Sequence, residues 1–551
     1  MKIHTGATQL IDVLERKDVQ SIFGYPGGAI MPIYDALYES DIDHYLCRHE
    51  QGAAFSAIGF ARASTNVGVC MATSGPGATN LVTSLADALL DSIPIIAITG
   101  QVSSQLMGTD AFQEVDIIGM SLSCTKHSFL IKHVNEIPAV IDKAFKIATT
   151  GRAGPVLIDI PNDIQLQQVT QTVSALSESE PIAPLPIEIL SEIKKRIAGA
   201  KKPILYVGGG VGMANSVSEL RDFMTVTNIP SVSTLKGLGT IDELHSGYLG
   251  MLGMHGTKAA NLAVQQCDLL IAVGARFDDR VTGKLDGFAP HAQVIHIDID
   301  QSEIGKRRIA DVALIGNLQN ILPAISIKLD INNWKKACQN LKAEYAWRYD
   351  HSGDSIYAPA VLKHISDAIT SDTVVITDVG QHQMWAAQHM SFTHPRNFIS
   401  SGGLGAMGFG LPAAIGAQVS RPQDPVMVIS GDGSLMMNIQ ELATIKRYQL
   451  PIKIVLFDNS KLGLVRQWQD LFFDGRQSET DLSDNPDFIM LAKSFGIMAR
   501  VVSTKSEVQA AVEQMLNHSG AFLLRVKIDE SDNVWPLVAP GSANEHMIDK
   551  N

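Results

Sequence analysis

Residues 425–460, PVMVISGDGSLMMNIQELATIKRYQLPIKIVLFDNS, decide the fold. A first apolar run ends in the turn GDGS, and one helix is expected over 437–449. A second apolar run, at 451–457, ends in Asp458 and Asn459. Strands that alternate with helices in this way form parallel sheets, whose loops open together at the carboxyl edge of the strands. The stretch therefore predicts an α/β fold with ligand-binding residues at that edge.

The two loops of this unit carry oxygen ligands of the kind that magnesium prefers. Asp432 offers a carboxylate and Asn459 an amide oxygen, and Mg²⁺ takes one or two such ligands beside phosphates and water. Gly431 and Gly433 allow backbone N–H groups to approach a diphosphate. The pattern resembles the thiamine diphosphate (ThDP) motif, a GDG turn followed by a pair ending in Asn, although Asp458 replaces the usual first Asn. A Gly-Asp-Gly turn beside an unrelated Asn is the alternative interpretation.

Composition limits the class of protein. A chain of 551 residues is too long for one core and predicts about three domains. Its net charge of −13 argues against a nucleic-acid or anionic-membrane partner. The longest apolar region, 81–102, is interrupted by Asp87, Asp91 and Pro94. We therefore expect helix, turn and buried strand there, and no membrane span.

The cysteines and the first residues indicate a cytoplasmic location. The five cysteines are scattered and show no CxxC spacing, which is typical of reduced thiols in a cytosol. Residues 1–20 form an amphipathic pattern of mixed charge, without the apolar core of a signal peptide or the Arg/Ser bias of a transit peptide.

Apolar runs divide the chain into three α/β blocks, and continuous apolar strands predict doubly wound parallel sheets. We predict domains at 1–170, 187–333 and 355–530, a Ser/Glu/Pro-rich linker at 171–186, and a closing segment at 531–551. The first and third blocks could share one topology, which the sequence alone leaves open. The expected strands are HYLCR (44–48), GVCMATS (68–74), PIIAITG (94–100), PVLIDI (155–160), PILYVGGG (203–210), DLLIAVGA (268–275), QVIHIDID (293–300), TVVITDVG (373–380), PVMVISGDG (425–433), PIKIVLF (451–457) and AFLLRVKID (521–529).

Glu50 follows the predicted strand at 44–48 and opens the helical run QGAAFSAIGFARAS. This position suits a ligand site at the carboxyl edge of an α/β sheet. ThDP requires a carboxylate against N1′ of its aminopyrimidine, because the proton exchanged there converts the 4′-amino group into the base that activates the cofactor. A glutamate favoured only by the helix dipole is the alternative.

Motifs along nearly the whole chain resemble the acetohydroxyacid synthase (acetolactate synthase) family of ThDP-dependent decarboxylases and carboligases. The resemblance is strongest to the catalytic subunit of the bacterial form that works with a small regulatory subunit and favours 2-oxobutyrate. The motifs are FGYPGGAI (23–30), CRHEQGAA (47–54), TSGPGATN (73–80), GTDAFQE (108–114), LGMHG (252–256), GARFDDRVTGK (274–284), DVGQHQMWAAQ (378–388), GLGAMGFGLPAA (403–414), GDGS (431–434) and VRQWQ (465–469).

This resemblance implies roles at the ThDP site. Glu50 would activate the cofactor, Asp432 and Asn459 would hold Mg²⁺, and Phe112 and Gln113 would lie near the reacting centre. Met407 would wedge beneath the bent cofactor, because an unbranched thioether can fill the angle between two rings. The residues expected along the diphosphate are Gly380, Gln381, His382, Gly431 and Gly433.

For the substrates, pyruvate and 2-oxobutyrate, the resemblance implies a second pocket. Arg280 would pair with the carboxylate of the incoming ketoacid, and Trp468 would wall the pocket that accepts its extra methyl group. Met254, Val379 and Leu464 would complete it. The alternatives are a salt bridge from Arg280 to a neighbouring aspartate, and ordinary packing for Trp468.

The middle block is expected to bind FAD in a non-redox role. PILYVGGGVGMA is not a strict GxGxxG, and a tight turn that needs glycine for steric reasons would look the same. The run RFDDRVTGK is stronger evidence for FAD binding, because related fermentative acetolactate synthases lack both FAD and this signature. The residues assigned to FAD by resemblance are Arg152, Gly208, Gly209, Gly210, Leu252, Gly253, Met254, His255, Gly274, Ala275, Arg276, Asp278, Asp298 and Ile299.

The implied activity is decarboxylation of pyruvate and ligation of the hydroxyethyl unit to pyruvate or 2-oxobutyrate, in branched-chain amino-acid synthesis. In this family, the residues that match Glu50 and Asp432 hold one cofactor across a subunit interface, so the resemblance implies a homodimer or tetramer. It also implies a small regulatory subunit. Relatives typically carry Lys where this chain has Asn162. A lysine would add positive charge to the substrate approach, so its absence affects the expected substrate affinity and not the reaction type. The rival interpretations are a FAD-dependent pyruvate oxidase, a fermentative acetolactate synthase, and a non-catalytic scaffold.

Overall fold

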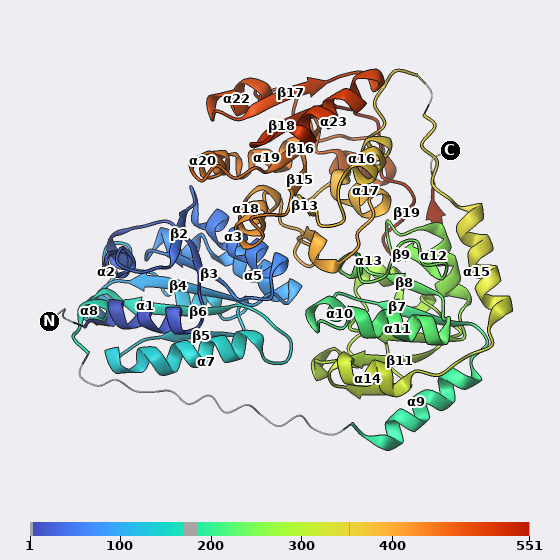
Figure 1. Ribbon diagram of the computed structural model, residues 1–551, viewed down its shortest axis with the longest axis horizontal. Helices are drawn as coiled ribbons and strands as arrows, with labels where there is room; N and C mark the ends of the chain where they lie inside the picture. The colour runs from blue at the N-terminus through green and yellow to red at the C-terminus, as the bar shows by residue number, and fades with distance from the viewer. Residues whose placement is uncertain (1–3, 170–184, 352, 550–551) are drawn as a thin grey trace.

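The computed structural model describes residues 4–169, 185–351 and 353–549. It contains three six-stranded sheets in which every pairing is parallel, each surrounded by helices (Figure 1). The sheets form three lobes, the first drawn in blue, the second in green and the third in orange to red. The predicted α/β class with three doubly wound parallel sheets is confirmed. Most of the linker predicted at 171–186 lies outside the described residues, which omit 170–184.

The first sheet has the strand order β2-β1-β3-β4-β6-β5. Its strands are β1 (Ser21–Gly24), β2 (Asp43–Leu46), β3 (Gly68–Ala72), β4 (Ile95–Gln101), β5 (His127–Leu130) and β6 (Val156–Pro161), and the helices of this lobe are α1 (Gly6–Arg16), α2 (Met31–Leu37), α3 (Glu50–Ala63), α4 (Pro76–Thr79), α5 (Val82–Asp91), α6 (Ile117–Ser121), α7 (Ile137–Thr149) and α8 (Asn162–Leu166). The apolar region at 81–102 is therefore helix, turn and strand, as expected.

The second sheet has the order β12-β11-β10-β7-β8-β9. Its strands are β7 (Pro203–Val207), β8 (Ser231–Ser233), β9 (Tyr248–Met251), β10 (Leu269–Val273), β11 (Gln293–Asp298) and β12 (Val312–Ile315), and its helices are α9 (Ile187–Gly199), α10 (Gly210–Met213), α11 (Val217–Thr227), α12 (Lys258–Gln266), α13 (Asp279–Thr282), α14 (Leu318–Ile325) and α15 (Asn332–Glu344). This is the order of a dinucleotide-binding sheet, whose ligand crevice lies between the carboxyl ends of β7 and β10.

The third sheet has the order β14-β13-β15-β16-β18-β17, which repeats the order of the first sheet. The two blocks thus share one topology. The strands are β13 (Val374–Thr377), β14 (Phe398–Ser400), β15 (Val426–Gly431), β16 (Lys453–Asp458), β17 (Met498–Val502) and β18 (Phe522–Lys527), and the helices are α16 (Ala358–Ala368), α17 (Gln381–His389), α18 (Gly410–Ser420), α19 (Asp432–Met436), α20 (Leu442–Arg447), α21 (Gly463–Phe472), α22 (Phe488–Ser494) and α23 (Val508–Asn517). A short antiparallel pair, β19 (Leu537–Val538) and β20 (Met547–Ile548), follows.

The single helix predicted over 437–449 is wrong. The chain forms α19, a 3₁₀ turn at Ile439–Glu441 and α20 instead. Asn438 interrupts the helix with φ −136° and ψ 31°, and its Nδ2 donates a hydrogen bond of 2.7 Å to the carbonyl of Gly408. Periodicity alone placed Asn438 in a helix interior, whereas its side chain binds the distant loop at Gly408.

The first and third lobes share one hydrophobic core, in which α3 packs against α18 (Figure 1). Small residues allow the two helices to touch backbone to backbone. The hydroxyl of Ser56 donates to the carbonyl of Pro412 at 2.9 Å, and a Cβ atom on Gly416 would lie only 1.7 Å from the carbonyl oxygen of Ser56. This contact fixes the distance between the lobe that carries Glu50 and the lobe that carries Asp432.

We expect Gly416→Ala to lower the free energy of unfolding by about 1–3 kcal/mol, because the added methyl group forces two packed backbones apart. Chemical denaturation followed by circular dichroism measures the change. Gly199→Ala is the matched control, since a Cβ on this helical glycine meets nothing within 4 Å. Equal stability of the two variants would contradict the close contact.

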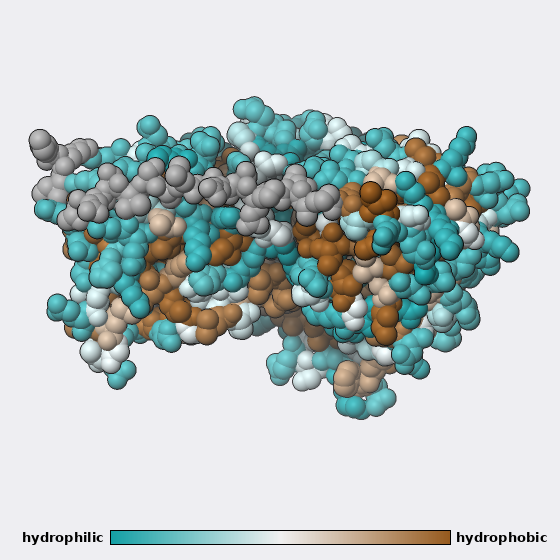
Figure 2. All heavy atoms as spheres, turned by 90° about the horizontal axis from the view of Figure 1, so that it is seen from below, coloured by the Kyte–Doolittle hydropathy of each residue, from teal (hydrophilic) through white to brown (hydrophobic). Residues whose placement is uncertain are grey.

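In the described part of the chain, no helix is long and apolar enough to cross a bilayer. On the face seen from below, apolar patches are separated by polar side chains (Figure 2).

Candidate functional site

A small cavity of about 60 Å³ lies where the chain leaves β13, β15 and β16. It brings together the residues predicted for the diphosphate and the metal. Those among its lining are Gly380, Gln381, His382, Gly431, Asp432, Gly433 and Asn459. Met407, predicted to wedge beneath the cofactor, and Val379 and Leu464, predicted for the substrate, also line it. A Cβ on Gly431 would lie 2.7 Å from Nδ1 of His382, so the glycine is needed for this imidazole to fit. Burial lowers the pKa of His382 to about 3, which keeps the ring neutral.

Asp432 has the environment of a metal ligand. Its Oδ1 accepts the N–H of Gly433 at 2.9 Å, whereas its buried Oδ2 has no hydrogen-bond partner among the described residues. Burial and the neighbouring Asp458 raise the pKa of Asp432 to about 7. Asp458 itself is paired with Arg525, whose Nε lies 2.6 Å away. A cation would relieve the unpaired carboxylate oxygen, so the donor fits a hard metal ion.

Asn459 lies in the same cavity as Asp432. Its Nδ2 donates to Oε1 of Gln381 at 3.2 Å, and its Oδ1 accepts the N–H of Lys461 at 3.2 Å. No cluster of three or more His, Cys, Asp or Glu able to hold a metal occurs in the described residues. A cation at Asp432 and Asn459 would therefore need further ligands from outside the protein, as Mg²⁺ takes from phosphates and water.

Asp378 is a site residue that the sequence reasoning missed. It is fully buried at the end of β13 and accepts the N–H groups of Val379, Gly408 and Gly410 at 2.9–3.2 Å. These bonds fix the loop that carries Met407, although burial still raises the pKa of Asp378 to about 6. The available signal was its position, because Asp378 directly follows β13 as Asp432 directly follows β15, the neighbouring strand.

Glu50 is the first residue of α3, as expected, and Oε2 accepts Nδ2 of Asn80 at 2.9 Å. The third lobe also reaches this turn, since the fully buried Glu441 accepts the N–H of Arg48 at 2.9 Å. Glu441 was likewise missed. Among the described residues, the lining of the small cavity comes from the third lobe alone, and Glu50 is not part of it.

The loop with Phe112 and Gln113 lies beside the TSGPG turn of the first lobe. A Cβ on Gly75 would lie 2.8 Å from the carbonyl oxygen of Gln113. Phe112 is 88% exposed and lines neither the small cavity nor the larger one described next. The structure of one chain therefore brings Gln113 towards the Glu50 turn and leaves Phe112 on the surface.

A much larger cavity, of about 820 Å³, lies where the three lobes meet. All the residues predicted for FAD line it except Gly253, whose N–H donates to Oδ1 of Asn261 at 2.9 Å. The turns after β7 and β10 form its floor at the switch point of the second sheet. A Cβ on Gly208 would lie 2.2 Å from the carbonyl oxygen of Gly274. Gly208 and Gly274 are thus required for the two turns to pack together. The cavity has the size of a dinucleotide site and lies where the fold places one.

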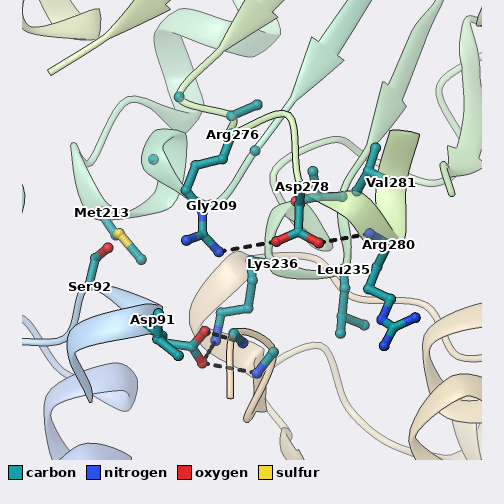
Figure 3. A pocket seen from close by; sticks show the side chains of 18 of the residues that line it. Asp91, Ser92, Gly209, Met213, Leu235, Lys236, Arg276, Asp278, Arg280 and Val281 are labelled. Carbon is teal, nitrogen blue, oxygen red and sulfur yellow. Dashed lines mark hydrogen bonds and ion pairs between the residues drawn. The ribbon is translucent and has the colours of Figure 1, made fainter. Parts of the chain in front are cut away.

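Charged side chains of the first and second lobes and backbone N–H groups of the third lobe form a network in the lining of this cavity (Figure 3). Lys236 of the second lobe lies 2.6 Å from Oδ2 of Asp91 in the first. The same carboxylate accepts the N–H groups of Gly402 and Gly403 in the third lobe at 3.1 and 2.7 Å. Arg152 bonds to Glu303 at 2.8 Å, across the first and second lobes. The network joins the three lobes around the cavity.

Arg280 and Trp468 meet at the other end of the large cavity. The guanidinium carbon of Arg280 lies 5.8 Å from the centre of the indole ring, a cation–π contact. Its Nε is also 3.9 Å from Asp279, the alternative partner, but 61% of the Arg280 side chain remains exposed. Met254 lines the same cavity, and Leu464 lines both cavities. The predicted substrate residues thus lie between the two predicted cofactor sites.

Comparisons with protein-family models match all three lobes. Residues 4–120 match the N-terminal TPP binding domain of thiamine pyrophosphate enzymes, residues 190–325 the central domain, and residues 378–526 the C-terminal TPP binding domain. TPP is thiamine pyrophosphate, the cofactor called ThDP above.

Curated relatives match over nearly the full length. The chain is 60% identical over 545 residues to the acetolactate synthase isozyme 2 large subunit of Escherichia coli (strain K12), covering 99% of each chain. It is 46% identical to the acetolactate synthase large subunit of Cyanidium caldarium, covering 99% of this chain and 97% of the other. It is 45% identical to the probable acetolactate synthase large subunit of Methanocaldococcus jannaschii, covering 98% and 95%. The chain belongs to the acetolactate synthase large-subunit family of thiamine pyrophosphate enzymes.

Proposed function

We propose that this enzyme decarboxylates pyruvate and transfers the hydroxyethyl unit to a second 2-ketoacid, giving 2-acetolactate from pyruvate or 2-aceto-2-hydroxybutyrate from 2-oxobutyrate. This makes it a transferase of branched-chain amino-acid synthesis. The observation that carries the proposal is the pairing of Arg280 with Trp468 in a cavity that shares Leu464 with the Asp432 pocket. A cation beside a rigid apolar wall matches a short ketoacid, which has one carboxylate and a small apolar end.

The residues present fit three bound groups. Asp432, with its unpartnered buried oxygen, and Asn459 would hold Mg²⁺, and the turns at 380–382 and 431–433 would hold the diphosphate of ThDP. The large cavity would hold FAD in a non-redox role. When bound, ThDP supplies the electron sink that decarboxylation requires.

The protein's own groups would orient the substrates and move a proton. Glu50 would exchange a proton at the aminopyrimidine, and Asn80, which donates to it at 2.9 Å, would hold the carboxylate in place. Arg280 would bind the carboxylate of the second ketoacid. Trp468, whose face is partly covered by Arg280, would exclude water and contact the ethyl group of 2-oxobutyrate.

The site would be completed by a second copy of the chain. Glu50 lies outside the cavity that Asp432 lines, yet both are assigned to one cofactor. A homodimer in which one subunit supplies Glu50 and the other supplies Asp432 accounts for this, and a tetramer would hold two such dimers. A small regulatory subunit is also proposed, together with a cytoplasmic location, where the five buried free cysteines would stay reduced.

Product analysis tests the proposal. Purified protein with ThDP, Mg²⁺ and FAD is supplied anaerobically with pyruvate and 2-oxobutyrate together. We expect acetohydroxybutyrate to exceed acetolactate at equal substrate concentrations. We expect Trp468→Leu to lower this preference about tenfold or more, because the pocket loses the wall against the extra methyl group. Phe473→Leu, at an exposed phenylalanine next to the same helix, is the control.

The rival functions predict different results. A pyruvate oxidase would need an electron acceptor and would form neither product anaerobically. A fermentative acetolactate synthase would form acetolactate alone. Either result would overturn the assignment.

A further inference from the structure

The segment 532–549, called here the C-terminal strap, touches both of the elements that carry the proposed substrate residues. It contacts α21 through Val534 and then forms β19, which is drawn near α13 and β9 of the second lobe (Figure 1). Val534, Leu537 and Val538 of the strap are at most 1% exposed. The strap is therefore part of the core between α21 and the second lobe.

On one side the strap is bound by α21, the helix of Trp468. Gln467 is fully buried, and its amide makes two bonds of 2.9 Å to the backbone of Val534, one donated from Nε2 and one accepted at Oε1. Arg466 donates to the carbonyl of Asp532 at 2.9 Å. Leu464 and Trp468, one helical turn apart, face the cavity instead. One face of α21 therefore binds the strap and another binds the proposed substrate.

On the other side the strap is bound by α13, the helix of Arg280. Asn544 is fully buried and its Nδ2 donates to the carbonyl of Val281 at 2.8 Å. Further along, the N–H of Val538 donates to the carbonyl of Met254, whose own N–H donates to the carbonyl of Arg280. The strap thus supports Arg280 by two routes. Asn544 binds the next residue of its helix, Val281, and Val538 binds Met254, which in turn binds Arg280.

Gly283 shows how close this contact is. It ends α13 with φ +54°, and a Cβ there would lie 2.5 Å from the carbonyl oxygen of Ser542 and 2.9 Å from Oδ1 of Asn544. Any side chain at this position would push the strap away from the helix of Arg280. Such a change adds a group at the contact without removing the side chain of Asn544, although it also crowds the Oδ1 atom of that side chain.

From these contacts we infer that Gln467 and Asn544 are positioning residues for substrate choice: they tie the helices of Trp468 and Arg280 to one strap and so fix the width of the second-substrate pocket. The inference rests on the function proposed above. A single extra methyl group distinguishes 2-oxobutyrate from pyruvate, so a small change in this width acts mainly on the ratio of the two products.

The test compares the full-length holoenzyme and its variants in the anaerobic competition of pyruvate with 2-oxobutyrate. We expect Gln467→Ala, Asn544→Ala and Gly283→Ala each to lower the preference for 2-oxobutyrate about threefold or more. General damage to the fold lowers both products in proportion and leaves their ratio unchanged. Asp549→Ala is the matched control, because Asp549 pairs with Lys258 at the exposed end of the same strap.

Hydrogen exchange on the apoprotein gives a readout independent of activity. Gln467→Ala should deprotect the amide of Val534, and Asp549→Ala should not. If Trp468→Leu lowers the product ratio while the three strap variants keep the wild-type ratio, the inference is overturned and the proposed function stands. If Trp468→Leu leaves the ratio unchanged, the assignment of Trp468 falls and the inference falls with it.

Discussion

Replacing Glu50 with Gln is expected to lower kcat by about 10²–10⁴-fold, the range that a positioned acid–base group contributes. The amide keeps the size of the carboxyl group and can still accept the Nδ2 hydrogen bond of Asn80, but it cannot exchange a proton with the aminopyrimidine. Steady-state formation of acetolactate from pyruvate measures the effect.

The fold should tolerate this change, so the melting temperature of Glu50→Gln should stay close to that of the wild type. Asn80→Ala removes only the neighbour that orients the carboxylate and should cost less activity. An undiminished rate in Glu50→Gln would show that the carboxylate is assigned wrongly.

Replacing Asp432 with Asn is expected to weaken Mg²⁺ binding by more than about 10–100-fold, the cost typical of losing an outer partner of a metal ligand, because Asp432 is a proposed direct ligand. Activity at ordinary Mg²⁺ concentration should be lost with it. Titration calorimetry of Mg²⁺ with ThDP measures the affinity.

Although Asp432→Asn should weaken Mg²⁺ binding, it should not lower the stability of the apoprotein. The wild-type carboxylate is buried with one oxygen unpartnered, and the amide removes that charge while keeping the bond from Gly433. The apo melting temperature of Asp432→Asn should therefore be equal to or above that of the wild type. Asp481→Asn, an exposed carboxylate paired with Lys461, is the control for both measurements. Unchanged Mg²⁺ affinity would contradict the metal assignment.

Most interior strands were predictable from the sequence, and most edge strands were not. Among the interior strands, the short β1 and β8 were missed. All the strands expected from apolar runs form, because a strand buried on both faces needs a continuous run of apolar residues. The edge strands β5, β9, β12, β14 and β17 were missed. They have only three to five residues, and β5 and β17 are largely half-buried or exposed. Backbone pairing to the neighbouring strand defines them, and this leaves little pattern in the side chains.

Site residues divide in a similar way. Asp432 and Glu50 were recognisable because each follows an apolar run at the carboxyl edge of its sheet. Asp378 also follows an apolar run, but it and Glu441 bind backbone N–H groups, those of Gly408 and Gly410 for Asp378 and that of Arg48 for Glu441, and these partners leave no motif. A side chain that binds backbone atoms of a distant loop leaves no matching residue in the sequence.

By itself, the sequence determined the α/β class, the three blocks and the residue types at the ends of their strands, because local apolar runs and turn residues encode these features. The tertiary structure alone decided which distant residues meet. It stacks Arg280 on Trp468, joins the two cavities through Leu464 and buries Gln467 against the strap. These contacts depend on how three lobes pack together, and the packing energy is spread over many small van der Waals contacts that no single motif records.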